Sequence, residues 1–150
     1  MDKYELKILA WTGIALVIFM VSVLHGVSKY ATDLPECIPY DAAFTQPKIS
    51  QLDDSTYQIF MLAQMWSFEP DEIYLPVGAE LDLYLTTKDV VHGMHIAGKG
   101  INMMAVPGGV NKTTMKFREP GVYPIVCHEY CGSGHQHMKA EIIVNYPKKN

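Results

Sequence analysis

The residues with the clearest potential for chemistry lie near the C-terminus, in the stretch CHEYCGSGHQHM that runs from Cys127 to Met138. It combines two thiols, an imidazole and a thioether, and Gly132 and Gly134 allow the tight turns that would aim these groups at one point. Thiolate and thioether ligands favour copper, whereas imidazole suits copper or zinc. Zinc sites use Cys, His and carboxylates, so Met138 makes copper the better candidate.

The second thiol favours a pair of copper ions over one. A blue copper site uses a single Cys, two His and a weak axial Met. Here Cys131 follows Cys127 by four residues, and two thiolates can each bridge two metal ions. Within the loop only His135 has the spacing of a one-copper site, so a second imidazole must come from elsewhere. His92, in the segment Asp89-Val90-Val91-His92, supplies it from a separate predicted strand.

Simpler interpretations of these residues stay open. Cys127 and Cys131 could form a disulfide outside the cell, although the Gly-His-x-x-Met continuation would then be unexplained. Spacing alone does not separate His92 from His95. The remaining side chains of interest are expected to be neighbours of the site, exposed, or core filler: His128, His137, Cys37, Met103, Met104 and Met115.

The first 29 residues are predicted to form a transmembrane anchor. No charged residue occurs between Lys7 and Lys29, and a spanning helix needs about 20 apolar residues. A cleaved signal peptide is the alternative, but its apolar core is usually shorter. Lys3 and Lys7 before the span, against Lys29 after it, favour a cytoplasmic N-terminus, with residues 30–150 on the outer side.

The rest of the chain is predicted to be all-β. Leu81, Leu83 and Leu85 alternate with polar residues, as in a half-buried strand. Residues 30–50 read as an extended linker and 51–150 as a Greek-key sandwich or barrel. The candidate strands are Thr56–Met65, Glu72–Val77, Glu80–Thr87, Val90–Ile96, Val110–Phe117, Gly121–Cys127 and Met138–Val144. The net charge of −4 argues against a nucleic-acid partner.

Together these motifs carry a family resemblance. The pattern C-x-E-x-C-G-x-G-H-x-x-M, preceded by D-V-x-H, resembles the binuclear copper centre, CuA, of cytochrome c oxidase subunit II. An aromatic strand around Gln64–Phe68 and the segment P-G-x-Y at 120–123 add to the resemblance. With one N-terminal helix, the chain looks most like the compact subunit II of ba-type heme–copper oxidases. The resemblance implies a cupredoxin-like domain.

The resemblance also implies a role for each matching residue. It makes Cys127 and Cys131 the bridging thiolates, with His92 and His135 as terminal imidazoles. Glu129 would ligate through its backbone carbonyl, and its side chain could reach a magnesium ion at the border with subunit I. The implied metal ligands are therefore His92, Cys127, Glu129, Cys131, His135 and, as the weak thioether ligand, Met138. Trp66 is a candidate electron-entry residue, although core packing explains it equally well.

The implied function is electron entry into a respiratory terminal oxidase of the plasma or inner membrane. CuA would take electrons from cytochrome c and pass them to heme in subunit I, where oxygen is reduced to water; a small extra subunit could also be present. Residues 36–89 carry a net charge of −8, which would steer a basic cytochrome or simply form a solvated surface. The alternatives are the CuA subunit of a nitric oxide reductase and a membrane-anchored copper carrier.

Overall fold

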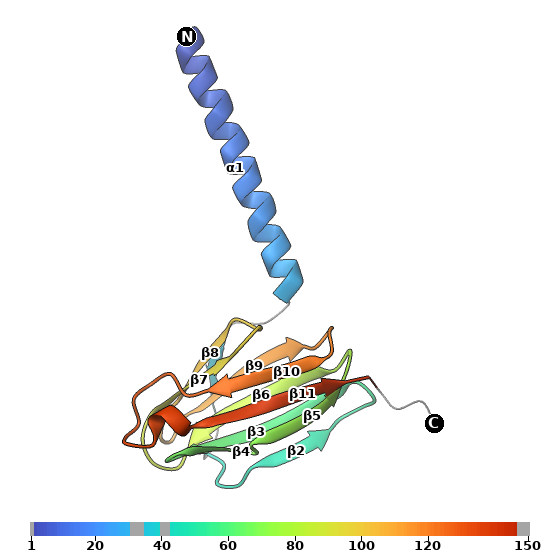
Figure 1. The fold of residues 1–150 in the computed structure, drawn as a ribbon, viewed down its shortest axis with the longest axis vertical. Helices are drawn as coiled ribbons and strands as arrows, with labels where there is room; N and C mark the ends of the chain where they lie inside the picture. The colour runs from blue at the N-terminus through green and yellow to red at the C-terminus, as the bar shows by residue number, and fades with distance from the viewer. Residues whose placement is uncertain (1, 31–34, 40–42, 147–150) are drawn as a thin grey trace. The chain divides into compact units, whose positions relative to one another are not determined.

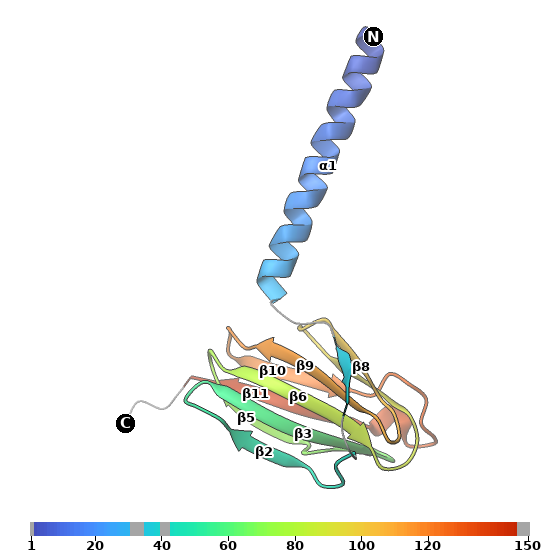
Figure 2. The same ribbon diagram turned by 180° about the vertical axis from the view of Figure 1, so that it is seen from behind.

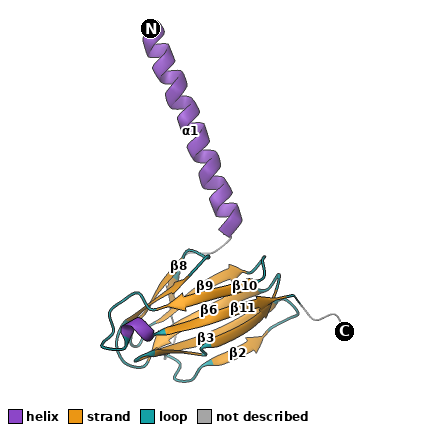
Figure 3. Cartoon of the chain, viewed as in Figure 1, coloured by secondary structure: helices purple, strands orange, loops and turns teal. Residues whose placement is uncertain are grey.

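The computed structural model describes residues 2–30, 35–39 and 43–146, in two compact units, Met1–Ala31 and Thr32–Asn150. The first unit is the helix α1 (Lys3–Tyr30), shown in Figure 3. Its start is capped by Asp2, whose carboxylate accepts from the Tyr4 N–H, while Glu5 accepts from the Asp2 N–H. The span Lys3–Lys29 contains an 18-residue window with a mean hydropathy of 2.2, and the helix is long and apolar enough to cross a membrane.

The second unit is a sandwich of two sheets, here called sheet A and sheet B (Figures 1 and 2). Sheet A has the order β1-β9-β6-β3-β2, and β4 pairs with β3. Its strands are β1 (Glu36–Ile38), β2 (Lys48–Gln51), β3 (Thr56–Gln64), β4 (Ser67–Glu69), β6 (Glu80–Thr87) and β9 (Val110–Lys116). Sheet B has the order β5-β11-β10-β7-β8. Its strands are β5 (Glu72–Pro76), β7 (His92–Ile96), β8 (Ile101–Ala105), β10 (Gly121–Val126) and β11 (Lys139–Asn145).

Two parallel pairings decide which turns lie together. β3 runs parallel to β6 in sheet A, with Thr56 opposite Glu80 and Ala63 opposite Thr87. β5 runs parallel to β11 in sheet B. Because β3 and β6 point the same way, the turns that follow them, at 65–66 and 88–91, leave sheet A at the same end.

The core lies between the sheets and follows from the alternation of apolar residues. In β6, Leu81, Leu83 and Leu85 are fully buried, whereas the intervening Asp82 and Tyr84 are not. Sheet B contributes its own buried side chains to the same cluster, including Met94, Ile96, Ile125 and Ile142. The predicted fold class, an all-β sandwich with one N-terminal apolar helix, is confirmed.

Differences from the sequence prediction are confined to short strands. The seven predicted strands are all present, with ends shifted by up to two residues. β8 was not predicted, although it buries alternate residues. β4 overlaps the aromatic strand expected around Gln64–Phe68 but begins and ends later. Strands β1 and β2 lie largely within the range predicted to be a linker, and they form the two edges of sheet A by pairing with β9 and β3. Strands of three and four residues with mostly exposed side chains carry too little alternation to be detected.

Replacing Leu83 with Ala should destabilise the sandwich strongly, because its side chain is fully buried in the middle of β6. We expect the free energy of unfolding to fall by about 2–5 kcal/mol. Denaturant titration of the full chain in detergent, followed by the circular dichroism of the sheets, measures this. Ile49→Ala, on the edge strand β2 and half exposed, is the control and should cost less than about 1 kcal/mol. Equal losses for both variants would contradict the assignment of the core.

Candidate metal centre

The loop between β10 and β11 holds most of the predicted ligands. Its two ends are joined by a hydrogen bond of 3.1 Å from the Cys127 N–H to the Met138 carbonyl. Within the loop, the His135 N–H donates to the Gly132 carbonyl at 3.1 Å, and a short 3₁₀ turn covers His135–His137. Gly132 has φ +120°, a conformation that side chains disfavour. The loop is therefore folded back on itself and directs its donor atoms inward.

The donor atoms of this loop gather around two buried thiols. The Sγ atoms of Cys127 and Cys131 are 3.8 Å apart, and both cysteines are free. Cys131 Sγ also lies 3.6 Å from His135 Nδ1 and 3.8 Å from Met138 Sδ. Cys127 Sγ lies 3.3 Å from the carbonyl oxygen of Glu129. The loop thus presents two sulfurs with a different set of further donors beside each.

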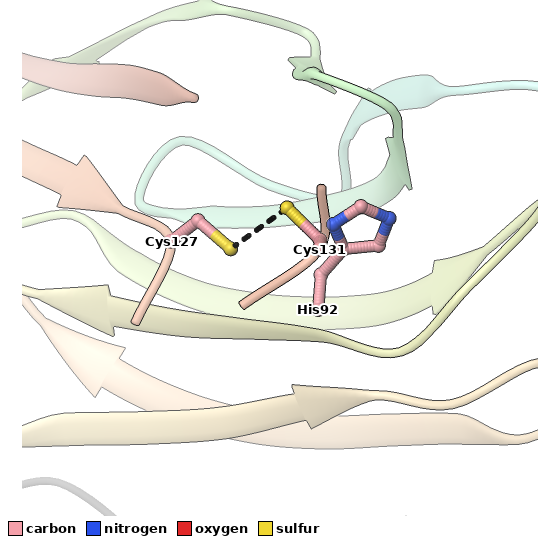
Figure 4. A group of neighbouring side chains, drawn as sticks. All are labelled: His92, Cys127 and Cys131. Carbon is pink, nitrogen blue, oxygen red and sulfur yellow. Dashed lines mark hydrogen bonds between the residues drawn. The ribbon is translucent and has the colours of Figure 1, made fainter. Parts of the chain in front are cut away.

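His92 approaches the same thiols from sheet B. It opens β7, is fully buried, and forms with Cys127 and Cys131 a group whose ligand atoms lie within 4.8 Å of one another. Figure 4 shows the ring with one nitrogen turned toward Cys131. This Nδ1 is buried and has no hydrogen-bond partner in the described part of the chain. An unpaired buried nitrogen beside two thiols is costly in a metal-free protein and fits a soft metal ion.

Asp89 holds the other nitrogen of that ring. Its Oδ1 lies 2.8 Å from His92 Nε2, which assigns the ring proton to Nε2 and leaves Nδ1 able to accept a metal ion. Partial burial disfavours the charge of Asp89. This effect of burial is outweighed by hydrogen bonds to the carboxylate, so the pKa of Asp89 is lowered. The donors are His92, the backbone N–H groups of Met65 and Val90, and the Thr87 hydroxyl.

Trp66 covers the loop from the turn between β3 and β4. Its Nε1–H donates to the Cys131 carbonyl at 3.2 Å. The indole ring lies over Gly132 and Gly134, and a Cβ at Gly134 would overlap the ring. About 42% of the residue remains exposed. Trp66 is therefore in contact with the loop from Cys127 to Met138, here called the metal loop, and also reaches the surface.

The structure does not bring every candidate residue to the thiols. His95 is occupied by the Ile101 carbonyl and Asn102 Oδ1, both 3.1 Å from its Nδ1. His128 and His137 are exposed, and the His128 ring lies against Gly93. Cys37 is exposed on β1. Met103 and Met115 are buried in the core, as expected of core filler.

Sequence reasoning quoted Asp89 only as part of a motif and missed what it does. It also missed the contact between Trp66 and Gly134. A signal was present in each case, namely an acidic residue three positions before the histidine and a glycine next to His135. The bond between Asp89 and His92 is local. The contacts of Asp89 with Met65 and of Trp66 with Gly134 join segments that are distant in sequence, so neither signal reveals them.

Comparison with known proteins identifies the family. Residues 41–146 match the family model described as the periplasmic domain of cytochrome c oxidase subunit II. The chain belongs to the cytochrome c oxidase subunit II family. As a member, it is a subunit of a heme–copper oxidase that works with subunit I. It is a single-pass membrane protein whose β domain lies on the outer side.

Individual relatives agree with the family. Cytochrome c oxidase subunit 2 of Thermus thermophilus is 29% identical over 153 residues, which cover 94% of this chain and 91% of that protein. A chain of a heme–copper terminal oxidase dimer, solved by cryo-EM, is 39% identical with a TM-score of 0.73, covering 95% of this chain and 100% of that one. The periplasmic domain of subunit II of the Bradyrhizobium japonicum cytochrome oxidase, 24% identical, shares the fold with a TM-score of 0.56, over 62% of this chain and 85% of that one.

The Cys131 thiol of this subunit II chain, without metal, should react slowly with alkylating reagents. Burial and the neighbouring Cys127 thiol raise the pKa of Cys131 to about 11, so little thiolate forms at neutral pH. At pH 7 we expect iodoacetamide to label Cys131 at least roughly tenfold more slowly than the exposed Cys37. The rate at Cys131 should rise about tenfold per pH unit toward pH 11. Mass spectrometry of the labelled peptides measures both rates, and equal labelling at pH 7 would refute the prediction.

Gly134→Ala should displace Trp66 or the metal loop, because the added methyl group overlaps the indole ring. We expect the free energy of unfolding to fall by about 1–3 kcal/mol, the usual cost of overpacking. Gly109→Ala is the matched control, since its Cβ would meet only ordinary contacts, the nearest at 3.6 Å. Denaturant titration compares the two variants. A Gly134→Ala protein as stable as the control would mean that the indole does not pack on the loop.

Proposed function

We propose that this chain carries a binuclear CuA centre that accepts electrons from cytochrome c and passes them to heme in subunit I, where oxygen is reduced to water. The observation that carries the proposal is the pair of buried thiols 3.8 Å apart. His92 Nδ1, which has no hydrogen-bond partner among the described residues, lies in the same group of donor atoms. His135 Nδ1 and Met138 Sδ lie beside the Cys131 thiol. A single-copper site would need only one of the two thiols.

The donor set supports a ligand assignment. Cys127 and Cys131 would bridge two copper ions, with His92 and His135 as terminal ligands. The thioether of Met138 and the backbone carbonyl of Glu129 would complete the set as weak ligands. The Glu129 side chain is exposed, so its carboxylate is free to take part in a magnesium site at the border with subunit I.

The protein around the centre favours electron transfer over metal exchange. Two copper ions held by both thiolates would share one electron. Each metal–ligand bond would therefore change little in length on oxidation. The chain contributes a rigid frame, because Cys127 and Met138 are joined at the loop base and His92 begins a strand of sheet B. Cys131 and Met138 are at most 5% exposed, which excludes water from the donor atoms. A rigid frame and the exclusion of water both lower the reorganisation energy of electron transfer.

The exposure of Trp66 and the charge of part of the chain suit an electron donor. Trp66, about 42% exposed and bonded to the Cys131 carbonyl, is the proposed electron-entry residue. Residues 36–89, with a net charge of −8, would attract a basic cytochrome c. We place the chain in the plasma or inner membrane with its N-terminus in the cytoplasm, beside subunit I and a possible small subunit.

Copper analysis and electron paramagnetic resonance of the full chain, loaded with copper in detergent, test the proposal. We expect two copper ions per chain and a hyperfine pattern from one electron shared equally between two nuclei. The centre should survive a chelator and cycle reversibly between its two oxidation states. One copper ion, zinc or no metal would contradict the binuclear centre, and copper that a chelator removes easily would favour a copper carrier.

A pair of histidine variants tests the ligand assignment in the same experiment. His92→Ala should abolish the shared-electron signal, because its Nδ1 faces the thiols. His95→Ala should retain the signal, since the His95 Nδ1 is already bonded to the Ile101 carbonyl and Asn102. The reverse result would overturn the assignment.

A further inference from the structure

The two oxygens of the Asp89 carboxylate serve two different parts of the molecule. Oδ1 accepts locally, from the Val90 N–H at 2.7 Å, and lies 2.8 Å from His92 Nε2. Oδ2 accepts from the Met65 N–H at 2.7 Å, across 24 residues of sequence. An aspartate in a turn commonly bonds the backbone near it. Here the second oxygen reaches the turn between β3 and β4 instead.

The turn that Asp89 reaches is the one that carries Trp66. Met65 directly precedes Trp66, whose Nε1–H donates to the Cys131 carbonyl at 3.2 Å. Its indole lies against Gly132, with Nε1 3.1 Å from the position of a Cβ there. A continuous series of contacts therefore runs from His92 through Asp89 to the Met65–Trp66 turn, and from there to Cys131.

We propose that Asp89 is a positioning residue that couples the orientation of His92 to the seating of the Met65–Trp66 turn on the metal loop. The proposal rests on the proposed function, because it concerns residues assigned there as ligand and electron-entry residue. The carboxylate itself is held in place by the Thr87 hydroxyl, at 3.1 Å from Oδ1, and by the Val90 N–H. It can therefore transmit a displacement of one partner to the other rather than absorb it by rotating.

Asp89→Asn separates this role from that of an ordinary turn residue. An amide offers one acceptor oxygen and one donor NH₂ group, whereas both carboxylate oxygens accept. If the amide oxygen faces His92, the NH₂ group meets the Met65 N–H. If it faces Met65, the NH₂ group meets the Nε2–H of His92. In either orientation the variant loses one of the two bonds, although its shape is nearly unchanged.

The test uses the metal-free full chain in detergent, in a Trp11→Phe background that leaves Trp66 as the sole tryptophan. Nitrogen-15 NMR reports hydrogen exchange at the Met65 amide and the Trp66 indole, and the ring-nitrogen shifts of His92. In Asp89→Asn we expect both exchange rates to rise about tenfold and the His92 shifts to move. Asp82→Asn is the matched control. Its carboxylate bonds Thr114 at 2.6 Å on sheet A, so all three signals should stay as in the parent.

A second variant covers the case in which Asp89→Asn does not fold. Trp66→Phe keeps an aromatic ring but removes the bond from Nε1 to the Cys131 carbonyl, together with part of the packing of the indole on Gly132 and Gly134. Coupling predicts faster exchange at the Met65 amide and a moved His92 shift in this variant also. If both signals keep their parental values, the two halves of the site are independent and the proposal is wrong.

Copper loading separates this proposal from the proposed function. With coupling, Asp89→Asn keeps two copper ions but shows a changed hyperfine pattern and a raised reduction potential, because a negative charge near a ligand is lost. A shift at His92 alone, with Met65 and Trp66 unchanged, would overturn the coupling. If the parent chain does not bind two copper ions, the proposed function fails, yet the metal-free exchange rates still decide the role of Asp89.

Discussion

The backbone hydrogen bond from Cys127 to the Met138 carbonyl closes the metal loop at its base, and the geometry of the site depends on this closure. It brings the first and last donor residues of the loop together where β10 and β11 meet, so the loop must fold back over a short distance. The tight turn at Gly132 and the close approach of Gly134 to Trp66 are what make this possible. A loop that ended elsewhere would leave the Met138 thioether away from Cys131.

Burial of soft donor atoms also determines which parts of the domain contribute to its stability. The thiols of Cys127 and Cys131, the Met138 thioether and His92 Nδ1 are withdrawn from water. Contacts among these groups add little to the free energy of folding in the metal-free chain, so the rest of the sandwich must hold them together. Its two sheets supply that stability through fully buried side chains such as Leu83 and Ile142. The packing of the core therefore fixes the positions of donor atoms that themselves add little to the stability of the domain.

Much of this arrangement could be predicted from the sequence, because its signals lie within short continuous segments. The run of uncharged residues after Lys7 indicates the anchor, the alternation in Leu81–Leu85 indicates a strand, and the spacing from Cys127 to Met138 indicates a soft-metal loop. The short edge strands β1 and β2 could not be found, since pairing with longer neighbours forms them. The bond from Met65 to Asp89 was equally hidden, because it depends on the parallel register of β3 and β6. Local sequence patterns identify the residues that could bind a metal, whereas the contacts that hold these residues in place depend on how distant strands pair.

The parallel register of β3 and β6 has one more consequence, for the opposite end of the sandwich. There the turn before β3 meets the turn before β6, through a hydrogen bond from the Glu80 N–H to the Ser55 carbonyl. β3 is nine residues long, so about 25 Å of strand separates that end from the Met65–Trp66 turn. A fluorescent label or an affinity tag placed at Asp54 or Ser55 would therefore report on this protein without touching the residues that hold the thiols.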